Sequence, residues 1–159
     1  MISRRMFLGG IAAWLLFSRV GGPALAQAPG MVVHKDPNCG CCGAWVDHLR
    51  ANGFDVSVVE TAQLNRIKAR LGVPNDLASC HTAEIDGFII EGHVPAESVR
   101  KLLSLRPSVR GLAVAGMPVG SPGMEVEGTP PETYDVVAFG PSGQRVFARY
   151  EGARELPAS

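Results

Sequence analysis

Apolar and polar positions after residue 30 follow two periodicities in turn, that of strands and that of amphipathic helices. Residues 54–58 alternate with a period of two, whereas Leu64, Ile67 and Leu71 have the spacing of one helix face. In chain order the patterns predict a strand at 31–34, a helix at about 43–52, a strand at 54–58, a helix at about 62–71, a hairpin at about 79–90 and a helix at about 95–105. The sequence therefore predicts the α/β class.

The order strand, helix, strand, helix, strand, strand, helix is typical of thioredoxin-like folds. It predicts a mixed central sheet flanked by helices, with right-handed crossovers that make the first two strands parallel. In such folds the loop entering the third strand approaches the N-terminus of the first helix and usually carries a cis-proline. Here that loop is 79–82, with the sequence Ser-Cys-His-Thr. We therefore expect Cys80 and His81 to lie beside the start of the first helix.

Residues 111–128, after the third predicted helix, are rich in glycine and proline and carry Met117 and Met124. This composition predicts a C-terminal loop that is suited to closing over a site. The alternation at 134–150 then predicts a second hairpin. We expect residues 153–159 to form a frayed, flexible tail.

The first 26 residues have the features of a bacterial twin-arginine export signal. Arg4 and Arg5 precede an apolar run at 7–17, and the segment ends in small residues at 24–26. The run has 11 residues, whereas a membrane-spanning helix needs about 20. We expect cleavage after Ala26, a periplasmic location and no stable membrane insertion of the mature chain.

The remainder is long enough for one domain, which we place at 27–152. The chain has 15 basic and 15 acidic residues, and the predicted signal holds three arginines and no acid, so the mature chain carries a formal charge of −3. This charge gives no reason to expect a nucleic-acid partner. A domain of this size can fold without disulfides, which leaves its cysteines free for chemistry.

Three of the four cysteines form the motif Cys39-Gly40-Cys41-Cys42 at the start of the first predicted helix. Unpaired amide groups and the helix dipole lower the pKa of a thiol there, and the thiolate is the form that binds metals and attacks disulfides. Neighbouring thiolates repel each other, and a bound cation turns that repulsion into attraction. The motif therefore predicts a soft-metal or redox site. The alternative is a Cys39–Cys42 disulfide with Cys41 as a small buried side chain.

Donors from other segments complete the predicted site. Thioethers favour Cu(I), so Met117 and Met124 are candidate ligands, although methionines also fill gaps in apolar cores. Cys80 and His81 are candidates from their place in the fold, against the simpler interpretations of a small buried thiol and a hydrogen-bonded loop histidine. His93, which follows the fourth strand, is a candidate ligand, a partner of a ligand or a helix cap.

Four motifs in the same order resemble a family of exported bacterial metal-binding proteins that includes the CopG-like copper-resistance proteins. They are Cys39-Gly40-Cys41-Cys42 with Trp45 and His48, the segment 79–82, the segment 91–96 and the segment 116–124 with its two methionines. The resemblance covers about residues 31–150 and implies a thioredoxin-like fold, copper at the cysteine cluster and interconversion of two copper oxidation states. Carried over to this chain, it implies that Cys39, Cys41, Cys42 and Cys80 are cluster ligands, with Met117, Met124, His81 and His93 as neighbours.

Three functions remain open on the sequence alone. The favoured one is a periplasmic copper-binding protein of copper resistance or homeostasis, in which thiolates bridge more than one Cu(I), and which is an enzyme if it also oxidises or reduces copper. Its partners are then copper ions, with other periplasmic copper-handling proteins or a thiol reductant. The second is a thiol-disulfide oxidoreductase that uses Cys39 and Cys42. The third is a structural zinc site, and an iron-sulfur centre is a further alternative.

Overall fold

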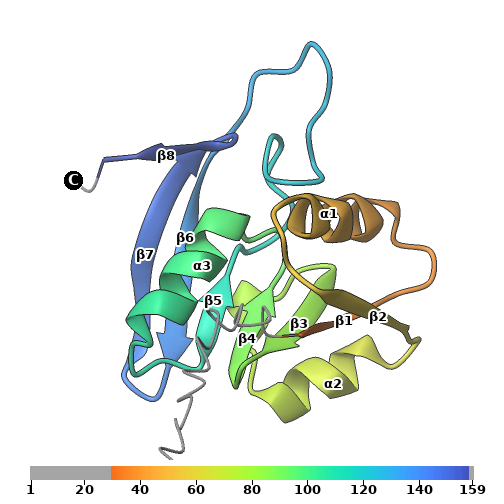
Figure 1. The fold of residues 1–159 in the computed structure, drawn as a ribbon, viewed down its shortest axis with the longest axis vertical. Coiled ribbons are helices and arrows are strands. Elements are labelled where there is room, and N and C mark those ends of the chain that lie inside the picture. Colours follow the sequence, from red (N-terminus) through yellow and green to blue (C-terminus); the bar gives the residue numbers. More distant parts are fainter. Residues whose placement is uncertain (1–29, 158–159) are drawn as a thin grey trace, which may run out of the picture.

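The computed structural model describes residues 30–157, and the predicted export signal lies outside this range (Figure 1). In chain order the elements are β1 (Met31–Lys35), α1 (Gly40–Ala51), β2 (Val56–Glu60), α2 (Leu64–Leu71), a 3-10 helix (Asn75–Leu77), β3 (His81–Ile85), β4 (Phe88–Glu91), α3 (Ala96–Leu105), β5 (Gly111–Ala113), β6 (Thr133–Gly140), β7 (Gly143–Glu151) and β8 (Arg154–Leu156). Within residues 30–157, none of the helices is both long and apolar enough to cross a membrane.

The strands form one mixed sheet in the order β2-β1-β3-β4-β5-β6-β7-β8. β1 is parallel to β2 and antiparallel to β3, and β4 is parallel to β5. The other neighbours are antiparallel, including the predicted C-terminal hairpin of β6 and β7. The predicted α/β class and mixed sheet flanked by helices are therefore confirmed. The element order from β1 to α3 is also the one expected of a thioredoxin-like core.

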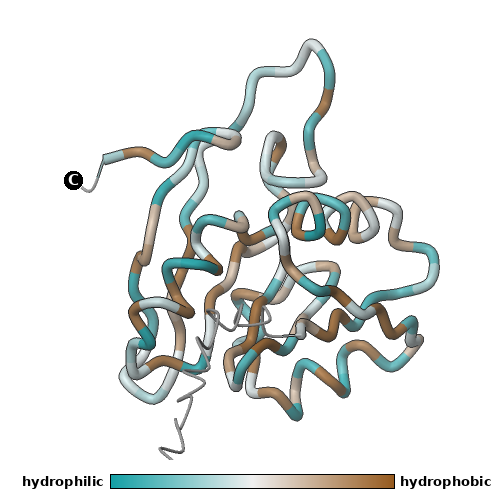
Figure 2. Tube along the Cα trace, in the orientation of Figure 1, coloured by the Kyte–Doolittle hydropathy of each residue, from teal (hydrophilic) through white to brown (hydrophobic). Residues whose placement is uncertain are grey.

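Alternation along the strands places an apolar cluster on each face of the sheet. On one face α1 and α3 pack with residues such as Ile90, and on the other α2 packs with residues such as Ile89. Neighbouring residues of β4 thus face opposite helices. Figure 1 shows α1 and α2 on opposite sides of β1 and β2, and Figure 2 shows hydrophobic residues concentrated along the central strands.

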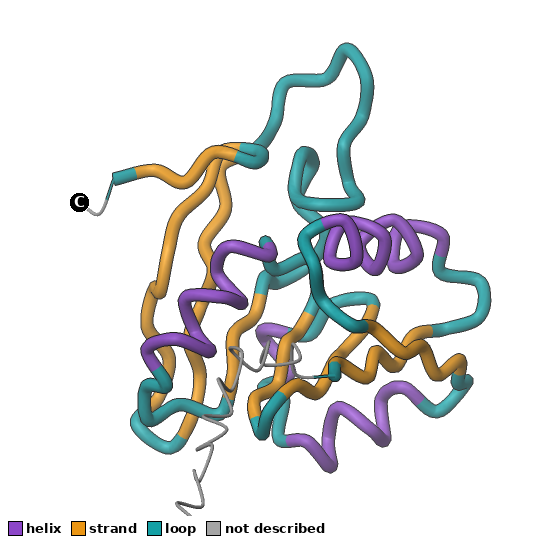
Figure 3. Tube along the Cα trace, in the orientation of Figure 1, coloured by secondary structure: helices purple, strands orange, loops and turns teal. Residues whose placement is uncertain are grey.

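Two boundaries differ from those predicted, and one strand was not predicted. α1 begins at Gly40, so Cys41 and Cys42 lie inside its first turn, and β2 begins at Val56, two residues later than expected. The strand β5 was not predicted, because Gly-Leu-Ala at 111–113 is too short to have a strand periodicity. A loop without helix or strand was predicted at 111–128; the structure places it after β5, at residues 114–132, and it extends past α1 (Figure 3).

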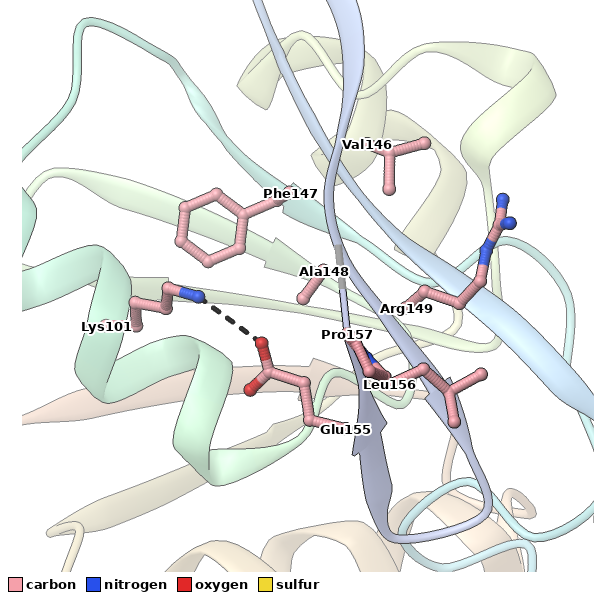
Figure 4. A pocket seen from close by; sticks show the side chains of 8 residues that line it. All are labelled: Lys101, Val146, Phe147, Ala148, Arg149, Glu155, Leu156 and Pro157. Carbon is pink, nitrogen blue, oxygen red and sulfur yellow. Dashed lines mark hydrogen bonds and ion pairs between the residues drawn. The ribbon is translucent and has the colours of Figure 1, made fainter. Parts of the chain in front are cut away.

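The flexible tail predicted at 153–159 is wrong for Arg154–Leu156, which form β8 and pair with β7. Gly152 turns the chain there with a φ of 58°. Lys101 Nζ of α3 lies 3.3 Å from Glu155 Oε1 of β8. Figure 4 shows this pair in a groove between α3, β7 and β8, which is lined without any cysteine, histidine or methionine. The groove is therefore separate from the predicted metal ligands.

Candidate metal centre

The motif cysteines occupy the first turn of α1. A turn after β1 leads into the helix, and Asn38 donates its backbone N–H to Asp36 Oδ1 at 2.8 Å. Cys39 is the N-cap residue, but its side chain makes no capping hydrogen bond. Because the first amide groups of a helix lack intrahelical acceptors, this turn presents the positive end of the helix dipole to the sulfur atoms.

Cys39 and Cys42 form a disulfide in this structure, with their Cα atoms 5.5 Å apart, while Cys41 and Cys80 are free thiols. The structure therefore shows the paired state that the sequence analysis kept as an alternative. Cys41 Sγ lies 3.6 Å from Cys39 Sγ and 3.9 Å from Cys80 Sγ. All four sulfur atoms lie within 4.8 Å of one another. Reduction of the disulfide would leave four thiols at one point.

The fourth thiol comes from the loop that the fold prediction identified. Cys80 directly precedes β3, and Cys42 Sγ lies 3.6 Å from the Cys80 carbonyl oxygen. The peptide bonds between residues 30 and 157 are all trans, so the usual cis-proline of this loop has no counterpart here. Burial, followed by the neighbouring Cys41, raises the pKa of the Cys80 thiol to about 11. Cys80 is therefore protonated at neutral pH until a metal displaces the proton.

Two buried histidines adjoin Cys80 on the side of the sheet that carries α1. His81 Nδ1 lies 3.3 Å from Cys80 Sγ, and His93 Nε2 lies 3.1 Å from the same atom. Together the three side chains form a second group whose donor atoms lie within 4.8 Å of one another. Burial lowers the pKa of both imidazoles, that of His81 well below its usual range. Both rings are thus neutral near pH 7, which is the state that binds metals.

Neighbouring groups fix the orientation of these two rings. His93 Nδ1 donates to the Pro122 carbonyl oxygen at 2.9 Å, which leaves the lone pair of Nε2 directed at Cys80. The Trp45 ring packs on His81 with centroids 4.3 Å apart, and Trp45 Nε1 donates to the Val94 carbonyl oxygen at 2.9 Å. The other nitrogen of His81, Nε2, is buried without a hydrogen-bond partner.

The loop that carries the two methionines contacts the site at two points. At its start, Ser79 Oγ donates to the Gly116 carbonyl oxygen. At its middle, Gly123 has a φ of +83° and packs so closely on α1 that a Cβ there would lie 2.6 Å from the backbone nitrogen of Trp45. Met117 is 51% exposed and Met124 is partly buried. The loop is where the sequence analysis expected it, and the role of Met117 and Met124 as ligands stays a prediction.

Lys68 and Glu91 support the loop that carries Cys80, through hydrogen bonds to His81 and Ser79, and the sequence analysis missed both. Lys68 Nζ lies 2.5 Å from Glu91 Oε1, and their side chains are 7% and 0% exposed. Loss of water lowers the pKa of Lys68 and raises that of Glu91, while the contact between them opposes both shifts. One signal was available: Lys68 occupies the apolar face of α2, four residues after Leu64 and three before Leu71.

The fold and the site define a mixed α/β protein with a cluster of cysteines and histidines whose donors suit a soft metal ion. Residues 77–124 match a family described as protein of unknown function DUF411. A solved structure named copper resistance protein CopG, form 2, is 48% identical to this chain. The match covers 78% of this chain and 99% of the CopG chain, with a TM-score of 0.74. Form 1 of the same protein has the same identity and TM-score, and the match covers 79% of this chain and 100% of the CopG chain. No curated protein matches the chain. The chain belongs to the CopG-like family.

Proposed function

We propose that this protein is a periplasmic copper-binding protein of copper resistance or homeostasis, and that it holds Cu(I) in a cysteine-bridged site. The observation that carries the proposal is the meeting of four sulfur atoms from two distant segments within 4.8 Å. The names of the two CopG relatives support copper as the cargo.

The donor set suits Cu(I) better than the alternatives. Thiolates, thioethers and imidazoles are soft or borderline ligands, and hard oxygen donors are missing from the two donor clusters found within residues 30–157. Four thiolates can bridge several ions, with His81, His93, Met117 and Met124 alongside. A structural zinc site usually takes two separated Cys-x-x-Cys pairs, whereas here three thiols share one helical turn.

The Cys39–Cys42 disulfide gives the site a redox chemistry. Opening it consumes two electrons and two protons, which a dithiol partner supplies as it becomes a disulfide itself. In the reverse direction, two thiols can reduce two Cu(II) ions to Cu(I), which re-forms the disulfide and releases two protons. Interconversion of the copper oxidation states is thus part of the proposal.

Metal content decides the proposal most directly. The mature domain, reduced and loaded without oxygen, is expected to hold more than one Cu(I) per chain against a competing chelator, measured by elemental analysis. A Cys80→Ser variant is expected to lose at least tenfold in Cu(I) affinity while it stays folded. One ion per chain or none would end the multinuclear site, and unchanged affinity in the variant would remove Cys80 from it.

Export is tested separately. If residues 1–26 are a cleaved twin-arginine signal, the protein in the periplasmic fraction begins at Gln27, which mass spectrometry identifies. Arg4→Lys with Arg5→Lys is expected to leave the uncleaved chain in the cytoplasm. Normal processing of that variant would exclude the twin-arginine route.

A second candidate is a thiol-disulfide oxidoreductase, which the observed Cys39–Cys42 pair at a helix N-terminus favours. Here one of the two thiolates attacks a partner disulfide and the other resolves the mixed disulfide. A Cys41→Ser variant separates the two functions. It is expected to keep disulfide exchange with a glutathione-linked peptide if exchange is the function, and to lose Cu(I) if copper binding is.

A further inference from the structure

The Lys68–Glu91 pair lies on the opposite side of the sheet from the cysteines. Ile89 faces α2, so Glu91, two residues further along β4, faces α2 as well. Lys68 reaches it from α2, while His81 packs on Trp45 of α1. The pair therefore approaches the loop that carries Cys80 from the face of the sheet that α2 covers.

The pair holds that loop on both sides of the thiol. Glu91 Oε1 accepts a hydrogen bond from the backbone N–H of Ser79 at 2.6 Å. Lys68 Nζ donates to the carbonyl oxygen of His81 at 2.9 Å. Ser79 and His81 are the two neighbours of Cys80, so one buried ion pair fixes the backbone immediately before and after the fourth thiol.

Stability alone gives no reason for such a pair. Removing two charges from water costs free energy that their attraction often fails to recover, and apolar residues of similar size are frequently as stable or more so. Because burial of this pair costs free energy, we look for its role in the contacts it makes with the loop.

We infer that Lys68 and Glu91 are positioning residues that hold Cys80 and His81 against Cys39, Cys41 and Cys42, in place of the cis-proline usual in this loop. The inference rests on the proposed copper function for its purpose, but the placement of Cys80 that it explains can be measured without metal. Neither residue is assigned contact with copper.

The test replaces the pair by apolar residues. In Lys68→Met/Glu91→Leu the charges are gone and so are both bonds to the loop. The matched control is Lys101→Met/Glu155→Leu, which makes the same substitutions at the exposed pair of Figure 4. In Lys68→Met/Glu91→Gln the amide oxygen still accepts from the Ser79 N–H, and only the bond to His81 is lost.

Two measurements are made on each variant, along with its urea midpoint. The first is the rate at which mild oxidation with diamide joins Cys41 to Cys80 in metal-free protein, mapped on peptides, because that bond needs the two sulfur atoms close together. The second is Cu(I) affinity against a chelator. For the leucine variant we expect an undiminished urea midpoint, a cross-linking rate at least fivefold lower and an affinity at least tenfold lower. For the glutamine variant we expect a cross-linking rate two- to fivefold lower than that of the wild type. For the control we expect the wild-type cross-linking rate and Cu(I) affinity.

A folded leucine variant with wild-type cross-linking overturns the inference. If that variant does not fold, a glutamine variant at the wild-type rate overturns it equally. Failure of the wild-type protein to bind copper overturns the proposed function instead, and the cross-linking rates still decide whether the pair positions Cys80.

Discussion

The two ends of the sheet differ in whether their charged side chains are buried or exposed. At the cysteine end, the Glu91 side chain is completely buried and Lys68 pairs with it from α2. At the other end, charged pairs such as Lys101–Glu155 lie on the surface. Because buried charge costs free energy and surface pairs contribute little, the cysteine end gives up stability to hold its donors in place. The C-terminal strands extend the sheet without that cost.

The largest expected effect comes from breaking the buried pair on one side only. Lys68→Ala leaves Glu91 buried without its cation, which should lower the free energy of unfolding by about 3–5 kcal/mol. Lys101→Ala at the surface pair should lower it by about 0.2–1 kcal/mol. Urea denaturation of the metal-free protein measures both. Similar losses at the two sites would show that the ends of the sheet do not differ in this way.

A smaller effect is expected from two glycines with positive φ. At Gly92, φ is +70° and an added Cβ would lie 2.5 Å from the Val114 carbonyl oxygen and 2.7 Å from Ser79 Cβ. Strain and overpacking together should make Gly92→Ala cost about 2–4 kcal/mol. Gly143 lies in the hairpin of β6 and β7, which we call the distal hairpin. Its φ is +90° and an added Cβ would meet no atom within 4 Å, so Gly143→Ala should cost about 1–2 kcal/mol from strain alone.

Copper binding distinguishes the same two glycines. Gly92 packs on the residue before Cys80, so Gly92→Ala should weaken Cu(I) binding as well as stability, whereas Gly143→Ala should leave the affinity unchanged. Chelator competition on folded protein checks this. An affinity loss at Gly143 would mean that the distal hairpin is coupled to the site.

A smaller effect than at Gly92 is expected in the core between α3 and β7. Tyr150 OH lies 2.9 Å from Ser98 Oγ, and both side chains are buried. Tyr150→Phe should cost about 1 kcal/mol through the loss of this hydrogen bond and of the one that Tyr150 OH donates to Glu155 Oε2 at 3.2 Å, with no change in copper content. Thermal unfolding and elemental analysis of the loaded variant test the two parts. A change in copper per chain would contradict the separation of the two ends.

The sequence was most informative where chemistry and periodicity coincide. The apolar periods predicted the order from β1 to α3, and that order correctly placed Cys80 beside the motif cysteines. It could not reveal that Lys68 pairs with Glu91, because the two residues are 23 positions apart and meet only when α2 covers β4. Nor could it choose between the Cys39–Cys42 disulfide and free thiols, since both fit the same spacing. β5 and β8 are set by pairing with neighbouring strands rather than by their own residues.

The packing of Trp45 on His81 gives the protein an internal optical probe. The sequence has two tryptophans, and the other, Trp14, falls within the predicted export signal. The emission of a mature chain would then come from Trp45 alone, whose ring centroid is 4.3 Å from that of a proposed copper neighbour. Quenching of its fluorescence can therefore follow the loading and release of the ion in real time, without any added label.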